Sequence, residues 1–159
     1  MDETDLKKNA ISGVLVVDKP TGLTSHDVVQ IIRRGTNIRR AGHTGTLDPR
    51  ASGVLVILIG PAVRLSEYVS ASDKRYQAVV RLGTSTDTYD ADGRVLSTSP
   101  VEISEEQFEQ VLQQFVGTIE QVPPPYSAVK VKGKKAYEMA REGEEVDLEP
   151  RTINVYSLE

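Results

Sequence analysis

The sequence contains no cysteine, and only two of its 159 residues are histidine. Without cysteine the chain forms neither a disulfide nor a thiolate metal site, and it offers no cysteine nucleophile. His26 and His43 are too few and too far apart for a zinc-binding pair. Residues 88–93 look like the start of a calcium loop, but such a loop would begin with Thr88 and end at Ser99 instead of a glutamate. We therefore expect no bound metal.

The sequence also lacks the glycine-rich motifs that bind nucleotides, both in the phosphate-loop form and in the dinucleotide form. We expect no cofactor, so any chemistry falls to carboxylates, histidine, tyrosine and hydroxyls. The apolar run at residues 54–59 has the length of a core strand and is too short to cross a bilayer. The first five residues lack the basic and apolar regions of a secretory signal. A cytoplasmic location is the default expectation for such a chain.

The composition is that of a soluble globular protein, with 38% hydrophobic and 26% charged residues. The length suits one domain with a real core. The net charge of −4 is unevenly distributed, because residues 13–75 hold nine basic and five acidic groups and residues 76–159 hold eight basic and fifteen acidic groups. The positive part can present a basic face to a phosphate backbone, although an ordinary mixed surface explains it equally well.

Hydrophobic periodicity and turn residues divide the chain after a polar lead-in at residues 1–12. The expected strands are residues 13–18, 54–59, 74–82, 94–96, 126–131, 145–148 and 151–158. The expected helices are residues 24–35, 61–69, 104–115 and 134–142. The alternation is too irregular for a doubly wound sheet. It favours an α+β fold, with a mixed, largely antiparallel sheet on which the helices pack.

Some of these elements carry explicit local signals. Thr24 or Ser25 can cap the first helix, and Ser104 with Gln107 forms a capping box at the start of the third. Residues 74–82 alternate between the two faces of an extended chain, which predicts a half-buried strand.

The stretch from Gly42 to Pro49, which reads Gly-His-Thr-Gly-Thr-Leu-Asp-Pro, is the centre of the sequence pattern. The proline disfavours helix at Asp48, and the glycines at 42 and 45 allow a ligand to approach the main chain closely. The apolar run at residues 54–59 anchors one end of this loop. A carboxylate held on a loop by a buried strand suits catalysis. The competing interpretation is an ordinary turn with a solvated aspartate.

Four further stretches form a wider pattern with this loop. They are Gly13-x-Leu15-x-x-Asp18-Lys19-Pro20-x-Gly22-x-Thr24-Ser25; Lys74-x-Tyr76 with Leu82-Gly83; Thr86-Asp87-Thr88-x-Asp90; and Pro123-Pro124-Pro125-Tyr126-Ser127-Ala128-Val129-Lys130 with Tyr137 and Ala140-Arg141. In order and spacing, the set closely resembles the TruB family of tRNA pseudouridine synthases over nearly the whole chain after residue 12. A match of this extent is highly specific.

The resemblance implies a pseudouridine synthase-like fold and the isomerisation of the T-loop uridine (uridine-55) of tRNA to pseudouridine. In that reaction the C1′–N1 bond breaks, the base turns in place, and C5 bonds to C1′. Asp48 matches the essential aspartate of the family. Its carboxylate would stabilise positive charge at C1′, add covalently, or remove the C2′ proton, and the sequence leaves these roles open. The resemblance implies no metal or redox cofactor.

Three more residues match family positions that contact or surround the substrate. Tyr76 matches the tyrosine that stacks on the target base, with a core tyrosine as the alternative. His43 matches a loop histidine that helps to unstack the T-loop nucleotides, with a turn histidine as the alternative. Asp90 matches an aspartate that pairs with an active-site arginine, with a turn-forming aspartate as the alternative.

The remaining site residues are basic. By the resemblance, Lys19 would lie near a phosphate or support Asp48, and the alternative is a solvated turn lysine. Arg39, Arg40 and Lys130 are candidates for contacts with the RNA backbone.

The resemblance has one departure, because family members continue beyond residue 159. The part that follows there contains an arginine that faces the catalytic aspartate, further strands of the sheet and, usually, a small RNA-binding domain. We therefore expect residues 13–159 to be the N-terminal part of the catalytic domain, without its C-terminal part and RNA-binding domain. For the full-length enzyme we expect the T-arm stem-loop of tRNA as the partner, and a monomer.

Two other functions compete with this one. The chain could be a non-catalytic fragment that binds tRNA, which the missing arginine motivates. It could also be a carboxylate hydrolase that uses Asp48 and His43. The only support for this alternative is that the two residues are close in the sequence.

Overall fold

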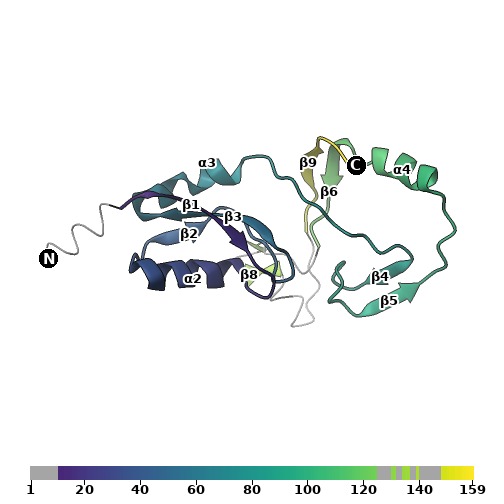
Figure 1. Ribbon diagram of the computed structural model, residues 1–159. Coiled ribbons are helices and arrows are strands. Elements are labelled where there is room, and N and C mark those ends of the chain that lie inside the picture. The colour runs from purple at the N-terminus through teal and green to yellow at the C-terminus, as the bar shows by residue number, and fades with distance from the viewer. Residues whose placement is uncertain (1–10, 125–129, 132–133, 137–138, 140–147) are drawn as a thin grey trace, which may run out of the picture. The chain divides into compact units, whose positions relative to one another are not determined.

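The computed structural model of the chain describes residues 11–124, 130–131, 134–136, 139 and 148–159 (Figure 1). The chain divides into two units: unit 1 ends at Gln77, and unit 2 begins at Ala78. All strand pairs among the described residues are antiparallel, and helices accompany them in both units. The predicted α+β fold is confirmed.

Unit 1 is built on a three-stranded sheet in the order β1–β3–β2. Its strands are β1 (Gly13–Lys19), β2 (Ala41–His43) and β3 (Gly53–Ile59). The register pairs Gly13 with Ile59 at one end of the sheet and Lys19 with Gly53 at the other. The strands predicted at residues 13–18 and 54–59 are therefore confirmed, each with one residue added.

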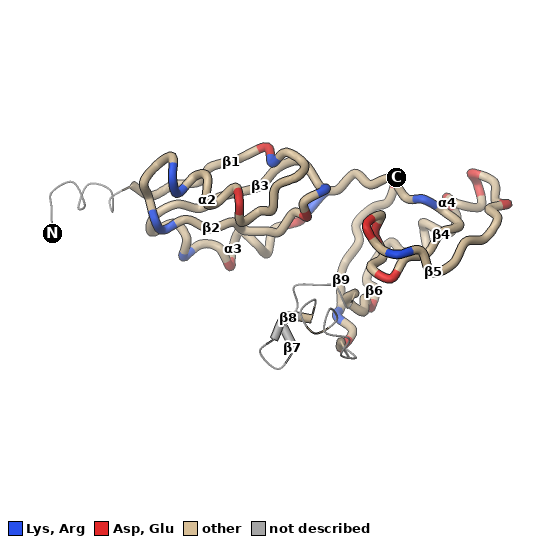
Figure 2. Tube along the Cα trace, turned by 90° about the horizontal axis from the view of Figure 1, so that it is seen from below, with Lys and Arg blue, Asp and Glu red and all other residues tan. Residues whose placement is uncertain are grey.

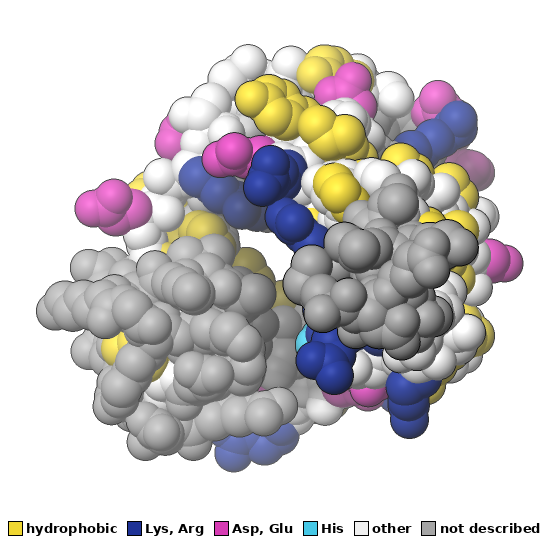
Figure 3. All heavy atoms as spheres, turned by 90° about the vertical axis from the view of Figure 1, so that its left-hand side faces the viewer, with side chains coloured by type: hydrophobic (Ala, Val, Ile, Leu, Met, Phe, Trp, Pro, Cys, Tyr) yellow, Lys and Arg dark blue, Asp and Glu magenta, His cyan; other side chains and the backbone are white. Residues whose placement is uncertain are grey.

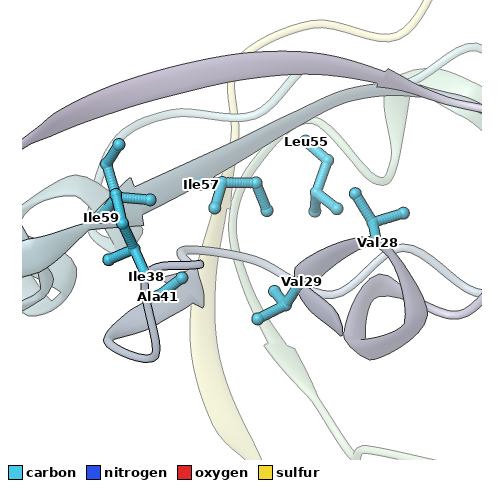
Figure 4. Packing of buried hydrophobic residues seen from close by; sticks show 7 residues of the cluster. All are labelled: Val28, Val29, Ile38, Ala41, Leu55, Ile57 and Ile59. Carbon is cyan, nitrogen blue, oxygen red and sulfur yellow. The ribbon is translucent and has the colours of Figure 1, made fainter. Parts of the chain in front are cut away.

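Helix α2 (Ser25–Thr36) packs on this sheet and creates the core of unit 1 (Figure 4). The seven buried residues of the core are Val28, Val29, Ile38, Ala41, Leu55, Ile57 and Ile59. Complete burial of a Val, Leu or Ile side chain contributes about 1.5–3 kcal/mol. This cluster is therefore a major source of stability for unit 1.

Local contacts fix both ends of α2. The Thr24 side chain accepts a hydrogen bond from the N–H of Asp27, whose carboxylate accepts one from the Thr24 N–H. Hydrogen bonds from the Thr24 side chain and then its backbone lower the pKa of Asp27. Asn37 ends the helix in the left-handed conformation, at φ 56°. Of the two predicted caps, Thr24 is the one that forms.

After β3 the chain makes two short helical segments, η1 (Gly60–Leu65) and α3 (Ser66–Ser70). Together they replace the single helix predicted at residues 61–69. The turn into η1 requires glycine, because Gly60 has φ +62° and an added Cβ would lie 1.9 Å from the carbonyl oxygen of Ile11.

The sheet of unit 1 also carries apolar side chains that remain accessible. Val14, Val16 and Val54 are 55%, 69% and 70% exposed. Val14 and Val16 belong to β1, an edge strand of the sheet among the described residues. Figure 3 shows one face of the molecule, on which hydrophobic side chains lie at the surface among charged ones.

Among its described residues, unit 2 has three two-stranded sheets, the helix α4 and two further helical residues, Ala136 and Met139. Its elements are β4 (Thr84–Thr86) with β5 (Val95–Thr98), α4 (Glu105–Gln113), β6 (Gly117–Gln121) with β9 (Arg151–Val155), and β7 (Lys130–Val131) with β8 (Lys134–Lys135). The capping box predicted for α4 is present, because Ser104 and Gln107 bond each other reciprocally. The strand predicted at residues 94–96 is β5, displaced by one or two residues.

The strand predicted at residues 74–82 is wrong. These residues are irregular, and none of the strand pairs in the described part of the chain includes them. Val79 is 100% exposed and Val80 is 68% exposed. Alternation makes a strand favourable only when a partner completes the ladder and a core receives the apolar face.

The predictions near the C-terminus have mixed outcomes. Residues 151–158 form a strand only up to Val155, because β9 ends where its partner β6 begins at Gly117. The helix predicted at residues 134–142 is wrong at its start, where Lys134 and Lys135 form β8 instead, but Ala136 and Met139, also among the described residues, are helical as predicted. Most of the strands predicted at 126–131 and 145–148 lies outside the described residues. Only β7 and the irregular Leu148 can be compared.

Candidate active site

The candidate catalytic carboxylate belongs to the loop between β2 and β3, residues 44–52, called here the Asp48 loop. The loop begins at the buried Thr44, whose N–H donates to the carbonyl of Val56 at 3.1 Å. Beyond Asp48 the chain turns, and the N–H of Ala51 donates to the Asp48 carbonyl at 3.0 Å. Both stems of the loop are thus fixed close to β3.

The β1–α2 connection (residues 20–24) leads into α2, and Gly22 of this connection together with Ser25 of α2 holds the Asp48 loop from the side. The N–H of Gly22 donates to the carbonyl of Pro49 at 2.7 Å. The hydroxyl of Ser25 accepts a hydrogen bond from the N–H of Leu47 at 2.8 Å and donates to the carbonyl of the same residue at 3.0 Å. The residues on both sides of Asp48 are therefore tied to the start of α2.

The carboxylate of Asp48 itself is left free by these contacts. Asp48 is exposed, and no side chain in the described ranges bonds to it or pairs with its charge. A fixed backbone with an accessible carboxylate suits a catalytic group, because reactive groups are held by a rigid frame and remain open to substrate. The turn and the exposed aspartate of the competing interpretation are present as well.

Lys19 is fully buried, at 0% exposure, where β1 ends. Its ammonium group donates to the carbonyl of Pro20 at 2.9 Å and to that of Leu23 at 2.7 Å. A buried charge needs such partners, because desolvation without them is costly. The alternative of a solvated turn lysine is therefore wrong. The side chain holds the connection that in turn holds the Asp48 loop.

His43 lies at the end of β2, opposite Ile57 of β3, five residues before Asp48. Its side chain is half-buried, and Nδ1 is buried without a hydrogen-bond partner in the described part of the chain. A ring nitrogen in neutral histidine can either donate or accept. His43 thus reaches the loop with one nitrogen available for a new bond.

Arg39 and Arg40 are exposed but lie at the other end of the sheet. The carbonyl of Arg40 accepts a hydrogen bond from Gly60, beyond the last residue of β3, whereas the Asp48 loop enters β3 at Gly53. The length of β3 separates the two places, which is about 20 Å for six steps of extended chain. Figure 2 shows Lys and Arg segments at the end of unit 1 where β1 begins.

The other predicted residues lie outside the Asp48 loop and outside the segments bonded to it. Tyr76 is 71% exposed on an irregular segment near the end of unit 1. Lys130 belongs to unit 2, in β7, where it pairs with Lys135. The carboxylate of Asp90 accepts bonds from the Thr88 hydroxyl and from two backbone N–H groups that follow it. The turn-forming role of Asp90 is thus present.

Sequence reasoning did not assign any role to Ser25 beyond helix capping. Its partner Leu47 lies 22 positions away, so no local pattern joins the two residues. The available signal was a small polar residue at the start of a predicted helix, within a motif shared with a known family.

The described residues contain no group of three or more potential metal ligands. No helix among them is long and apolar enough to cross a membrane.

Comparisons with known proteins show the family to which the chain belongs. Residues 33–159 match the profile of the TruB family pseudouridylate synthases, N-terminal domain. A chain from a solved Cbf5–Nop10–Gar1 complex superimposes with a TM-score of 0.57 at 28% identity, covering 96% of this chain and 36% of that one. The protein described here belongs to the TruB family.

Individual curated proteins have a higher sequence identity to the chain than this solved structure has. The chain is 53% identical over 148 residues to the tRNA pseudouridine synthase B of Salmonella typhimurium and to that of Citrobacter koseri. It is 52% identical to that of Escherichia coli O1:K1 / APEC. Each alignment covers 93% of this chain and 47% of the relative. The chain thus spans about half the length of the curated relatives it matches.

Proposed function

We propose that the complete protein isomerises a uridine of tRNA to pseudouridine, at uridine-55 of the T-loop, with Asp48 as its catalytic carboxylate. One observation supports this most. In a chain 53% identical to a tRNA pseudouridine synthase B, the carboxylate of Asp48 is exposed and unpaired in the described ranges, on a loop held on both sides. That arrangement offers a preoriented anionic group to a substrate.

The reaction requires the C1′–N1 bond to break and a C5–C1′ bond to form, while C5 loses its proton to restore the aromatic base and N1 gains one. A carboxylate can assist by stabilising positive charge at C1′, by adding to the nucleoside, or by removing the C2′ proton. Each role needs the carboxylate to reach the ribose, and an exposed loop position allows this approach. The three roles remain open.

The target base must leave its stack before it can rotate, and an extruded base needs a new aromatic or apolar neighbour. Tyr76, exposed at 71%, is our proposed stacking partner. His43, directly before the Asp48 loop, would help to unstack the neighbouring nucleotides. Asp90 would combine its place in the turn with an ion pair to an arginine of the complete protein.

The basic residues take two different roles in this proposal. Lys19 supports the frame of Asp48, since its ammonium group is buried and bonded to two carbonyls. Arg39, Arg40 and Lys130 bind RNA phosphates. For the two arginines the contact falls about 20 Å from the reacting nucleotide, as the strand length implies.

A second function concerns the present chain alone: it binds tRNA without converting it. The specific observation is that no cation pairs with Asp48 in the described part of the chain. A positive neighbour favours the charged form of a carboxylate, and the catalytic interpretation expects one beside Asp48. Turnover by residues 1–159 would exclude this function, and salt-dependent tRNA binding without turnover would support it.

The deciding experiment measures pseudouridine in tRNA incubated with the complete protein and with its Asp48→Asn variant. We expect the variant to lose turnover and to keep tRNA binding. Asp18→Asn is the matched control, because it removes another exposed carboxylate from unit 1 and should retain turnover. Full turnover by Asp48→Asn would refute the assignment.

A further inference from the structure

Ser25 makes contacts that a helix-capping residue would not need. Its side chain is 3% exposed, and the residue begins α2. The N-cap is the preceding Thr24, whose hydroxyl bonds Asp27. Helix initiation therefore does not use the Ser25 hydroxyl, which is directed to the Asp48 loop instead.

Both hydrogen-bonding functions of the Ser25 hydroxyl go to one residue, Leu47. The hydroxyl accepts from its N–H at 2.8 Å and donates to its carbonyl at 3.0 Å. A hydroxyl has one proton to donate, so this proton is already committed to the Leu47 carbonyl. Ser25 is therefore poorly suited to act as a nucleophile or acid, and its contact fixes a peptide position.

The position fixed in this way is adjacent to the reacting group. Leu47 directly precedes Asp48, and its side chain packs against the core of unit 1. On the other side of Asp48, Pro49 is held through its carbonyl by Gly22. Asp48 is thus the residue between two tied neighbours, while no side chain in the described ranges bonds to its carboxylate.

We propose that Ser25 is a positioning residue for the isomerisation, which sets the direction of the Asp48 carboxylate by fixing the peptide before it. This inference rests on the proposed function. Because the contact is formed without substrate, its loss should misdirect the carboxylate and leave the RNA-binding surface intact. Misplacement of a catalytic group by about 1 Å can cost on the order of 100-fold in rate.

The test compares four forms of the complete protein in pseudouridine formation: unchanged, Ser25→Ala, Ser25→Thr and Thr24→Ala. Thr24→Ala is the matched control, because it removes a hydroxyl with two hydrogen bonds from the adjacent residue, which does not contact the Asp48 loop. We expect Ser25→Ala to lower kcat by about 100-fold with KM unchanged. Thr24→Ala should retain kcat, and Ser25→Thr should recover much of it through its hydroxyl.

Equal kcat for Ser25→Ala and Thr24→Ala would overturn the inference, as would a change confined to KM. Hydrogen exchange of the Leu47 amide in the unchanged protein gives a readout that needs no variant and no turnover. We expect this loop amide to be protected like the amides of β3, and free exchange would contradict the proposal. An unchanged protein without turnover would refute the proposed function, whereas protection at Leu47 tests the contact separately.

Discussion

The two units use the same local signals with different results. Helix α2 in unit 1 and helix α4 in unit 2 both begin with a complete capping box. Yet α2 buries Ser25, Val28 and Val29, whereas α4 buries none of its residues. A cap and an apolar stripe are therefore enough to define a helix, but a core requires a second surface that the sequence of the helix does not contain.

The same contrast holds for the units as a whole. Unit 1 has a seven-residue core, whereas the described buried hydrophobic residues of unit 2 are Ala136 and Leu148. Val111 of α4 and Phe115, two residues beyond it, are 46% and 50% exposed.

The largest expected effect comes from breaking the core of unit 1. Ile57→Ala should lower the free energy of unfolding by about 2–5 kcal/mol, because Ile57 has 0% exposure and its loss leaves a cavity. The matched change Val111→Ala in α4 should cost less than about 0.5 kcal/mol in this chain. Urea denaturation followed by far-ultraviolet circular dichroism measures both. Equal losses would show that α4 has a core after all.

The next largest effect is expected from removing the helix caps, one in each unit. Thr24→Ala should cost about 1 kcal/mol in the unfolding of unit 1, since the helix and its core unfold together. Ser104→Ala removes an equivalent cap but should reduce only the helix content of α4 and leave the transition of unit 1 unchanged. Thermal unfolding monitored by circular dichroism would separate the two. A shift of the unit 1 transition by Ser104→Ala would indicate coupled units.

A smaller effect of opposite sign is expected in the turn between β4 and β5. Tyr89 has φ +62° and is 77% exposed, and a left-handed backbone is unfavourable for a tyrosine. Tyr89→Gly should therefore stabilise this turn by up to about 1 kcal/mol. Proton–deuterium exchange in β4 and β5 would report it as slower exchange. Faster exchange would mean that the ring makes a contact that outweighs the strain.

The smallest effect is a pH dependence within the α2 cap. Because hydrogen bonds from Thr24 lower the pKa of Asp27 in the folded state, its carboxylate form stabilises the fold. This contribution is fully present above the ordinary aspartate pKa and is lost as the pH falls through the lowered value. Asp27→Asn should therefore weaken the acid dependence of unit 1 unfolding. An acid titration of both forms measures this, and identical titrations would contradict it.

The elements that could be predicted are those with complete local signals. β1, β3, α2 and α4 carry apolar patterns, caps or turn residues within their own sequence, and each forms close to its expected place. The pairing of β6 with β9 joins residues 30 or more positions apart, and the three-residue β4 is too short to show alternation. Residues 74–82 show the reverse error, since a clear pattern was present and a partner was absent in the described ranges.

The candidate site, too, has features that could be predicted from the sequence and features that could not. Glycines, Asp48-Pro49 and the following apolar run identified the loop, and the family resemblance supplied a role for Asp48. The bond from Ser25 to Leu47 could not be predicted, because it joins residues 22 positions apart. The buried state of Lys19 could not be predicted either, because its carbonyl partners Pro20 and Leu23 belong to a turn whose shape no sequence pattern specifies. The roles of Tyr76, His43 and Asp90 stay predictions.

The chemical reactivity of the buried Lys19 ammonium group can report local opening of the fold. Amine-reactive reagents modify lysines that solvent reaches, and Lys19 has no accessible surface in the folded chain. Acylation at this one lysine would therefore record the opening of the connection between β1 and α2, at a rate set by the opening. Mass spectrometry of the labelled peptide would report how often the β1–α2 connection beside the Asp48 loop opens. This measurement needs no tRNA substrate.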